Sequence, residues 1–132
     1  MASRSTTVIL ENKTDFQLTL DSDNVYLDHG EWTKGMNPPA TIVGQCQGAW
    51  ENESDGLLTG DQGHVRYTIT DGETDSGGQN KNWVQINWDN PYGGDNSYDQ
   101  SVSDKSKYTI TRNSNTGSGN NATVKFSLTK AN

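Results

Sequence analysis

The residues best suited to bind another molecule are tyrosines and tryptophans in polar surroundings. Tyr92 and Tyr98 lie in DNPYGGDNSYD (residues 89–99), a stretch of Gly, Asp and Asn that offers them little core, and Trp88 stands at its entrance. Such rings combine an apolar body with a polar tip, which suits membrane interfaces and sugar rings alike. Their faces also attract quaternary ammonium groups by about 0.5–2 kcal/mol each. The stretch therefore predicts a binding surface for a lipid headgroup or a sugar.

The other aromatic residues divide by their local pattern. On alternating apolar faces, where we expect a core, lie Phe16, Tyr67, Phe126 and one of Trp83 or Trp88. In polar, loop-like contexts, where we expect exposure, lie Tyr26, Trp32, Trp50, Tyr92 and Tyr98. Trp88 alternates with Ile86 and so fits a core position as well as a binding role.

Three carboxylates, Asp89, Asp95 and Asp99, lie close together in the same stretch. Calcium takes six to eight oxygen ligands, and this stretch could supply several, but its spacing is not that of an EF-hand loop. Asp and Asn more often shape turns through their own side chains. We therefore predict turn chemistry here and no metal site.

Residues able to catalyse a reaction are few. His29 and His64 each stand beside a glycine, outside any metal-binding histidine motif, and there is no nucleophile elbow, P-loop or dinucleotide fingerprint. Cys46 is the only cysteine, which excludes an internal disulfide and paired zinc ligands. It is expected to be a small strand residue. We predict a protein that is not an enzyme and that needs no cofactor.

Short strands must position the aromatic residues. Thr7–Asn12 and Phe16–Leu20 alternate apolar and polar residues around a turn and are predicted to form a hairpin. Trp50 to Gly63 is expected to be a long polar connection in which Leu57-Leu58 can fold back on the core. Further strands are predicted at Val25–Leu27, Thr41–Gly48, Val65–Thr70, Trp83–Trp88, Lys107–Asn113 and Ala122–Thr129. Turns at intervals of roughly ten residues favour a sandwich or barrel.

Composition and charge limit the class of protein. The 132 residues show no break in composition, which predicts one domain over residues 1–132. The apolar share of 29% is low enough to raise the possibility of disorder, but regularly spaced β-branched and aromatic residues argue for a thin β-structure. Ten Lys+Arg against seventeen Asp+Glu give a net charge of −7, which argues against nucleic acid and anionic membranes as partners. A neutral or zwitterionic partner stays open.

The first residues, MASRSTTVIL, contain no apolar stretch of signal-peptide length, and no stretch approaches a membrane span in length. Production in the cytosol, or release by a route that needs no signal peptide, is therefore expected.

Several motifs in order resemble the aegerolysins. They are TTVILENKT, LDHGEW (residues 27–32), GLLTGDQGHVRYTI (56–69), INWDNPYGGDNSYD (86–99) and SKYTITRN (106–113), so the likeness covers nearly the whole chain. Bacterial members, including the small component of binary insecticidal crystal toxins, are the most similar. A weaker resemblance to actinoporins is confined to the regions 59–67 and 88–92. The order and spacing of the motifs carry the resemblance more than any single motif does.

The resemblance implies an all-β fold, a two-sheet antiparallel β-sandwich that recognises membrane lipids, often sphingolipids, and recruits a larger pore-forming partner protein. Tyr26 and Tyr92 correspond to loop tryptophans that contact lipid in fungal members. Thr59 falls near an acidic residue that senses the state of the lipid. All three positions depart from that pattern: tyrosine keeps an aromatic contact, whereas threonine removes the carboxylate on which the choice of lipid depends.

We therefore expect the small, non-lytic component of a two-component cytolysin. A lipid headgroup would lie among Tyr26, Trp32, Trp50, Thr59, Trp88, Asp89, Tyr92 and Tyr98, with the Asp89 carboxylate beside a choline or ethanolamine cation. The residues 1–14 lack the spacing of the amphipathic segment found in actinoporins, which favours binding without lysis. The alternative is a lectin-like carbohydrate-binding module, because aromatic rings flanked by Asp and Asn also hold sugars.

Overall fold

The structure is built almost entirely of β-strands, because apolar and polar residues alternate along most of the chain. The computed structural model describes residues 2–132. In β7 (Asp61–Ile69) and β8 (Trp83–Asn90) every second side chain is buried, as a pleated strand with one face on a core requires. The remaining elements are β1 (Ser5–Asn12), β2 (Leu18–Leu20), η1 (Ser22–Asn24), β3 (Tyr26–His29), β4 (Glu31–Trp32), β5 (Thr41–Ile42), β6 (Gln47–Glu53), β9 (Ser97–Val102), β10 (Tyr108–Arg112) and β11 (Asn121–Lys130).

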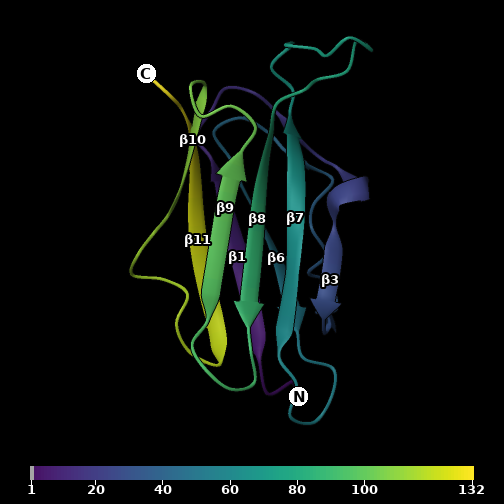
Figure 1. Ribbon diagram of the computed structural model, residues 1–132, viewed down its shortest axis with the longest axis vertical. Coiled ribbons are helices and arrows are strands. Elements are labelled where there is room, and N and C mark those ends of the chain that lie inside the picture. The colour runs from purple at the N-terminus through teal and green to yellow at the C-terminus, as the bar shows by residue number, and fades with distance from the viewer. Residues whose placement is uncertain (1) are drawn as a thin grey trace.

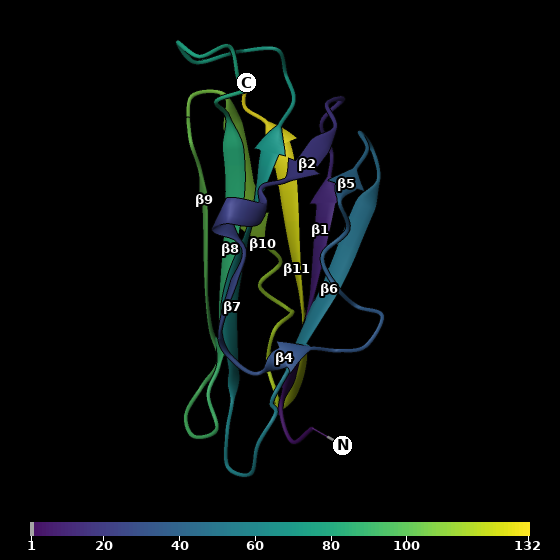
Figure 2. The same ribbon diagram turned by 90° about the vertical axis from the view of Figure 1, so that its right-hand side faces the viewer.

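Two sheets pack face to face, which confirms the predicted β-sandwich (Figures 1 and 2). One sheet has the order β10-β11-β1-β6-β4. The other has the order β5-β2-β7-β8-β9, and β3 also pairs with β7. Pairing is antiparallel except between β1 and β11, the first and last strands of the chain, which run parallel. This pair ties the two ends of the described chain into the centre of one sheet.

The core lies between the sheets and contains a row of large aromatic side chains. Trp50 of β6 is 5.8 Å from Tyr67 of β7 and 6.3 Å from Trp88 of β8, measured between ring centroids. All three are buried, and so is Phe126. The predicted core positions Tyr67 and Phe126, and the choice of one tryptophan from Trp83 and Trp88, are confirmed; Phe16 is half-buried against the same core.

The predicted hairpin of Thr7–Asn12 with Phe16–Leu20 is wrong. β1 pairs with β6 and β11 in one sheet, whereas β2 pairs with β5 and β7 in the other. The Asn12 amide explains the crossing, because its Nδ2 donates to the carbonyls of Phe16, Ile42 and Val43 and thereby fixes the connection between the sheets.

The region 41–63 also departs from its prediction. A turn with Gln45 in the left-handed region divides the expected strand Thr41–Gly48 into β5 and the start of β6. Cys46 lies in this turn and is exposed, so it is not a strand residue. Half of the expected long connection Trp50–Gly63 is strand, since β6 reaches Glu53 and β7 begins at Asp61. Only residues 54–60 form a loop.

Two loops lie together at the end of the sandwich that holds the N-terminus (Figure 1). They are the β6–β7 loop (residues 54–60) and the β8–β9 loop (residues 91–96). The turn between β5 and β6 lies at the opposite end (Figure 2). No helix among residues 2–132 has the length and apolar character needed to span a membrane.

Candidate functional site

Exposed apolar side chains gather on the two loops at the N-terminal end of the sandwich. Leu57 and Leu58 of the β6–β7 loop are 90% and 61% exposed, and Tyr92 of the β8–β9 loop is 45% exposed. The loops touch, because a Cβ added at Gly60 would lie 2.3 Å from the Asn90 carbonyl oxygen. Together Leu57, Leu58 and Tyr92 form what we call the apolar tip.

The β6–β7 loop holds its two leucines outward through a tight turn. The Thr59 hydroxyl donates to the Gly56 carbonyl at 2.8 Å and accepts from the Gly56 amide at 3.1 Å. Leu58 adopts a φ of 60°, in the left-handed region that costs a residue with a Cβ about 1–2 kcal/mol. The loop therefore stores backbone strain where two large apolar side chains face solvent, which is typical of binding sites.

Tyr92 is held at the tip by an arginine from the N-terminal segment. The Arg4 guanidinium donates from Nη2 to the Tyr92 carbonyl at 2.7 Å, and its Cζ lies 4.8 Å from the centre of the Tyr92 ring. The two contacts fix both the backbone and one ring face of Tyr92, while almost half of the side chain stays exposed. An ordered, exposed ring is available for a ligand at little entropic cost.

A cleft of about 410 Å³ opens behind the tip. We call it the tip cleft; its walls come from the β6–β7 loop, the facing ends of β7 and β8, and the last residue of β3. They comprise His29, Leu58, Thr59, Gly60, Asp61, Gln62, Asp89, Asn90, Pro91 and Tyr92. The cleft thus combines an apolar rim with polar and ionisable walls, as sites for amphipathic ligands do.

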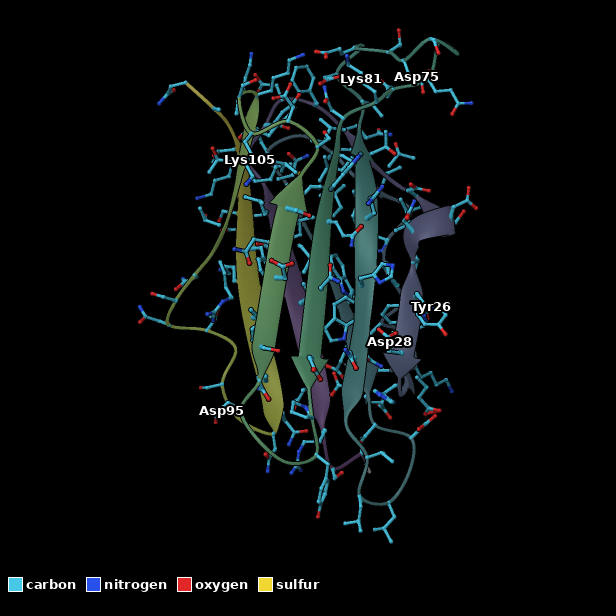
Figure 3. The ribbon with its side chains drawn as sticks, viewed as in Figure 1. Tyr26, Asp28, Asp75, Lys81, Asp95 and Lys105 are labelled. Carbon is cyan, nitrogen blue, oxygen red and sulfur yellow. The ribbon has the colours of Figure 1, made fainter. Side chains whose placement is uncertain are left out.

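The tip cleft adjoins a shallower acidic hollow on the outer face of the six-stranded sheet. This hollow, of about 200 Å³, shares Gln62 and Asp89 with the cleft and adds Asp28 of β3 and Asp99 of β9 (Figure 3 labels Asp28). Three carboxylates on one face attract a cationic group. Among residues 2–132, no three His, Cys, Asp or Glu side chains converge in a way that would hold a metal ion.

Asp61 is the most unusual residue of the cleft. It is 1% exposed, and neither carboxylate oxygen makes a hydrogen bond. Burial raises the pKa of Asp61 from 3.8 to about 7, the Thr6 hydroxyl offsets part of this rise, and the charges of Asp89 and Glu51 add to it. Thr6 Oγ1 lies against the carboxyl but is itself without a hydrogen bond, so the two groups are close without meeting hydrogen-bond geometry.

Three of the residues predicted from the sequence lie in the tip cleft: Thr59, Asp89 and Tyr92. Two others need correction, because Trp50 and Trp88 are buried in the core and present no surface to a headgroup. Trp50 was placed in a loop since its neighbours are polar, but it lies in β6, paired with Val8. Trp88 Nε1 donates to Asn52 Oδ1 at 2.9 Å, a bond that satisfies both groups inside the sandwich.

The remaining predicted residues lie outside the cleft. Trp32 is half-buried and packs on Trp88, at 6.1 Å between ring centroids. Tyr98 belongs to β9, not to a loop; its hydroxyl donates to the Gly117 carbonyl at 2.7 Å, so it ties the neighbouring loop in place. Tyr26 is exposed on β3, where its ring lies 6.3 Å from that of His64 on the outer face of the sheet (Figure 3).

Three residues of the site were not predicted. The Leu57-Leu58 pair was expected to fold back on the core, yet both side chains are exposed. Asp61 carried a weak signal, since it begins a strand whose alternation places residues 61, 63, 65, 67 and 69 on one buried face. Extending that period of two back from Val65 would have placed a carboxylate inside the sandwich.

Comparison with known proteins finds the same fold in solved structures. No family model matches the chain, and no curated protein sequence does. The crystal structure of IP-1A from Alcaligenes faecalis superposes with a TM-score of 0.69 at 15% identity, covering 99% of this chain and 94% of that one. RahU protein, solved in complex with a TRIS molecule, gives a TM-score of 0.72 at 14% identity, covering 100% and 98%. These likenesses show a β-sandwich shared over the whole chain.

Proposed function

We propose that this chain is a membrane-lipid-recognition protein that binds with its apolar tip against the bilayer. The observation that carries the proposal is the clustering of Leu57, Leu58 and Tyr92 on two touching loops at one end of the molecule. In such a pose the leucines enter the acyl boundary and the tyrosine lies at headgroup depth, where amphipathic rings are most stable.

The walls of the cleft favour a zwitterionic headgroup. The Asp89 carboxylate, with Asp28 and Asp99 beyond it, lies where the cationic end of a choline or ethanolamine group would rest. A net charge of −7 disfavours anionic lipids over the whole surface. Sphingolipids with such headgroups are therefore the proposed ligands, in line with the aegerolysin resemblance.

The same resemblance supports a role as the small, non-lytic component of a two-component, insecticidal cytolysin. The chain would concentrate at a target membrane and recruit a larger pore-forming protein. The outer face of the five-stranded sheet and the far end of the sandwich would stay free for that partner, because only the tip enters the lipid.

Sedimentation with vesicles of defined composition tests the proposal. Phosphatidylcholine vesicles are compared with vesicles that also contain sphingomyelin or ceramide phosphoethanolamine, with an entrapped dye to report lysis. We expect selective pelleting without dye release. Tyr92→Ala should weaken pelleting, whereas Val43→Ala, which removes an exposed apolar side chain at the opposite end, should not. Equal pelleting of both variants would contradict the site, and no pelleting with any sphingolipid would contradict the function.

Carbohydrate binding is the second candidate, and one observation favours it. The strand register places Tyr26, His64, Asn87 and Asp99 side by side across β3, β7, β8 and β9. A flat row of amide, imidazole and carboxylate groups beside an exposed ring can hold a sugar. Binding to immobilised glycans that is lost in Asn87→Ala and kept in Tyr92→Ala would support this function in place of the first.

A further inference from the structure

The buried Asp61 carboxyl has no role in the proposed lipid contact, yet it lies directly behind the β6–β7 loop. Asp61 is the first residue of β7 and follows Gly60, the point at which this loop packs against Asn90 and Pro91. Its side chain points between the sheets, opposite Thr6 of β1, and both of its oxygens lack a hydrogen-bond partner. Any change in the charge of this carboxyl therefore acts on the base of the apolar tip.

The groups around Asp61 do not neutralise its charge. The titratable side chains near enough to act on its charge are Glu51 of β6 and Asp89 of β8, on the outer faces of the two sheets, and Tyr98 of β9. His29 of β3 lines the same cleft. Arg4, just before β1, is engaged with Tyr92. Within residues 2–132 the only ion pairs join Glu73 to Lys81 and Lys107, so no cation pairs with Asp61.

Even with the Thr6 hydroxyl beside it, an ionised carboxylate without a cation is costly in this position. A protonated carboxyl is not: it becomes a donor, and the unpaired Thr6 oxygen is an acceptor within reach of a small adjustment. The closed arrangement of the loop is therefore matched to the protonated form. The ionised form is stabilised only when water reaches the carboxylate, which requires the β6–β7 loop to move away from Asn90 and Pro91.

We propose that Asp61 is a proton-binding site that controls the β6–β7 loop, with the protonated carboxyl holding the loop closed and the ionised carboxylate opening it. The loop is the element best able to respond, because Leu57 and Leu58 make few contacts and Leu58 is strained. The effect on membrane binding rests on the proposed function, whereas the loop motion itself does not.

The direction of the pH effect follows from the two pKa values. The pKa of Asp61 is about 7 in the closed protein, against 3.8 for an exposed aspartate. The bound proton therefore stabilises the closed state. This stabilisation is fully present below pH 4 and is lost as the pH rises through 7. Between these limits the equilibrium constant for opening should rise about tenfold per pH unit, and above pH 7 it should level off.

Two measurements on the free protein test this switch. The first is the NMR titration of the Asp61 side-chain carboxyl carbon in the wild type, for which we expect a midpoint near pH 7. The second is amide hydrogen exchange of residues 54–63, expressed at each pH as the exchange rate in the wild type divided by the exchange rate in Asp61→Asn. Asparagine mimics the protonated form, so the ratio should increase from pH 4 to 7 and then stay constant.

Asp23→Asn is the matched control, because Asp23 is an exposed aspartate in η1 that lines neither the tip cleft nor the acidic hollow. Its exchange in the 54–63 segment should follow that of the wild type at every pH. A midpoint below pH 5, or a wild-type to Asp61→Asn ratio that does not change with pH, would overturn the proposal.

Vesicle pelleting at pH 5.5 and 7.5 then separates the switch from the lipid function. Because the leucines and Tyr92 lie together only while the two loops touch, we expect the wild type to pellet more at pH 5.5 and Asp61→Asn to pellet equally at both pH values. Equal pelleting of the wild type at both values would refute the link between the loop and binding. Absence of pelleting at any pH would contradict the lipid function alone, because the NMR and exchange results need no lipid.

Discussion

Replacing both leucines of the apolar tip by serine, in Leu57→Ser/Leu58→Ser, removes the part of the surface proposed to enter the membrane. Serine keeps a compact side chain and accepts the polar surroundings of the loop. Because the two leucines are 90% and 61% exposed, the folded protein gains little from burying them. We therefore expect the free energy of unfolding to change by less than about 0.5 kcal/mol, as for other surface substitutions.

Membrane affinity should change far more. Full transfer of a leucine side chain from water to an apolar environment is worth about 1.5–3 kcal/mol. Scaled by the exposed fractions of Leu57 and Leu58, the pair contributes about 3 kcal/mol of binding free energy when the tip enters the acyl region. Each 1.4 kcal/mol is a factor of ten, so the partition coefficient should fall by about a hundredfold.

The assay is partitioning into sphingomyelin-containing vesicles over a range of lipid concentrations, with the unfolding curve of each variant recorded in parallel. Val43→Ser is the matched control, since Val43 is also an exposed apolar residue but lies in the turn between β5 and β6 at the far end. A fall of less than about threefold in a folded double variant, or an equal fall in Val43→Ser, would refute the proposed orientation of the tip.

Three further predictions concern the packing that supports the site. Asn52→Ala leaves Trp88 Nε1 without its acceptor and should lower the free energy of unfolding by about 2–3 kcal/mol, measured by chemical denaturation; a smaller loss would mean that water replaces the amide. Gly60→Ala places a Cβ 2.3 Å from the Asn90 carbonyl oxygen and should cost about 1–3 kcal/mol, whereas an unchanged stability would show that the loops separate freely. Cys46 is exposed, so a thiol reagent should modify it in the folded protein as fast as in the denatured chain, and protection would contradict its position in the turn.

Regular alternation allowed the long strands to be predicted from the sequence, but not their partners. The predicted strand Val65–Thr70 matches the second half of β7 to within one residue, and Ala122–Thr129 lies within β11, because every second residue there is apolar and buried. Pairing depends on contacts far apart in the chain, such as Val8 with Val124, and no local pattern encodes them. The expected hairpin at residues 7–20 failed for this reason.

Tyr92 and Asp89 of the candidate site could be predicted because each combines an aromatic or acidic side chain with turn-forming neighbours, whereas Thr59 was expected only from the family resemblance. Trp50 misled the prediction because its strand also buries Asn52, a polar residue that is satisfied only by Trp88 and by the Glu31 carbonyl on another strand. Asp61 could not be assigned a role, since its raised pKa arises from burial that exists only in the folded chain.

Buried polar residues lie toward both ends of the sandwich, and the unpaired carboxylate lies at the tip end. Thr6, Asn52, Asp61 and Asn90 are buried nearest the tip, and Asn12, Thr14 and Asn82 are buried toward the opposite end, whereas the central layers hold Trp, Tyr, Ile and Val. Apolar burial in the central layers supplies most of the stability, so the end layer can carry an unpaired carboxylate and a strained loop without endangering the fold. Two proteins with 14–15% identity share this sandwich over almost their whole length, which shows that very different residues support it. The end of such a sandwich can therefore hold groups suited to binding, provided that supporting interactions such as the Trp88–Asn52 hydrogen bond are kept.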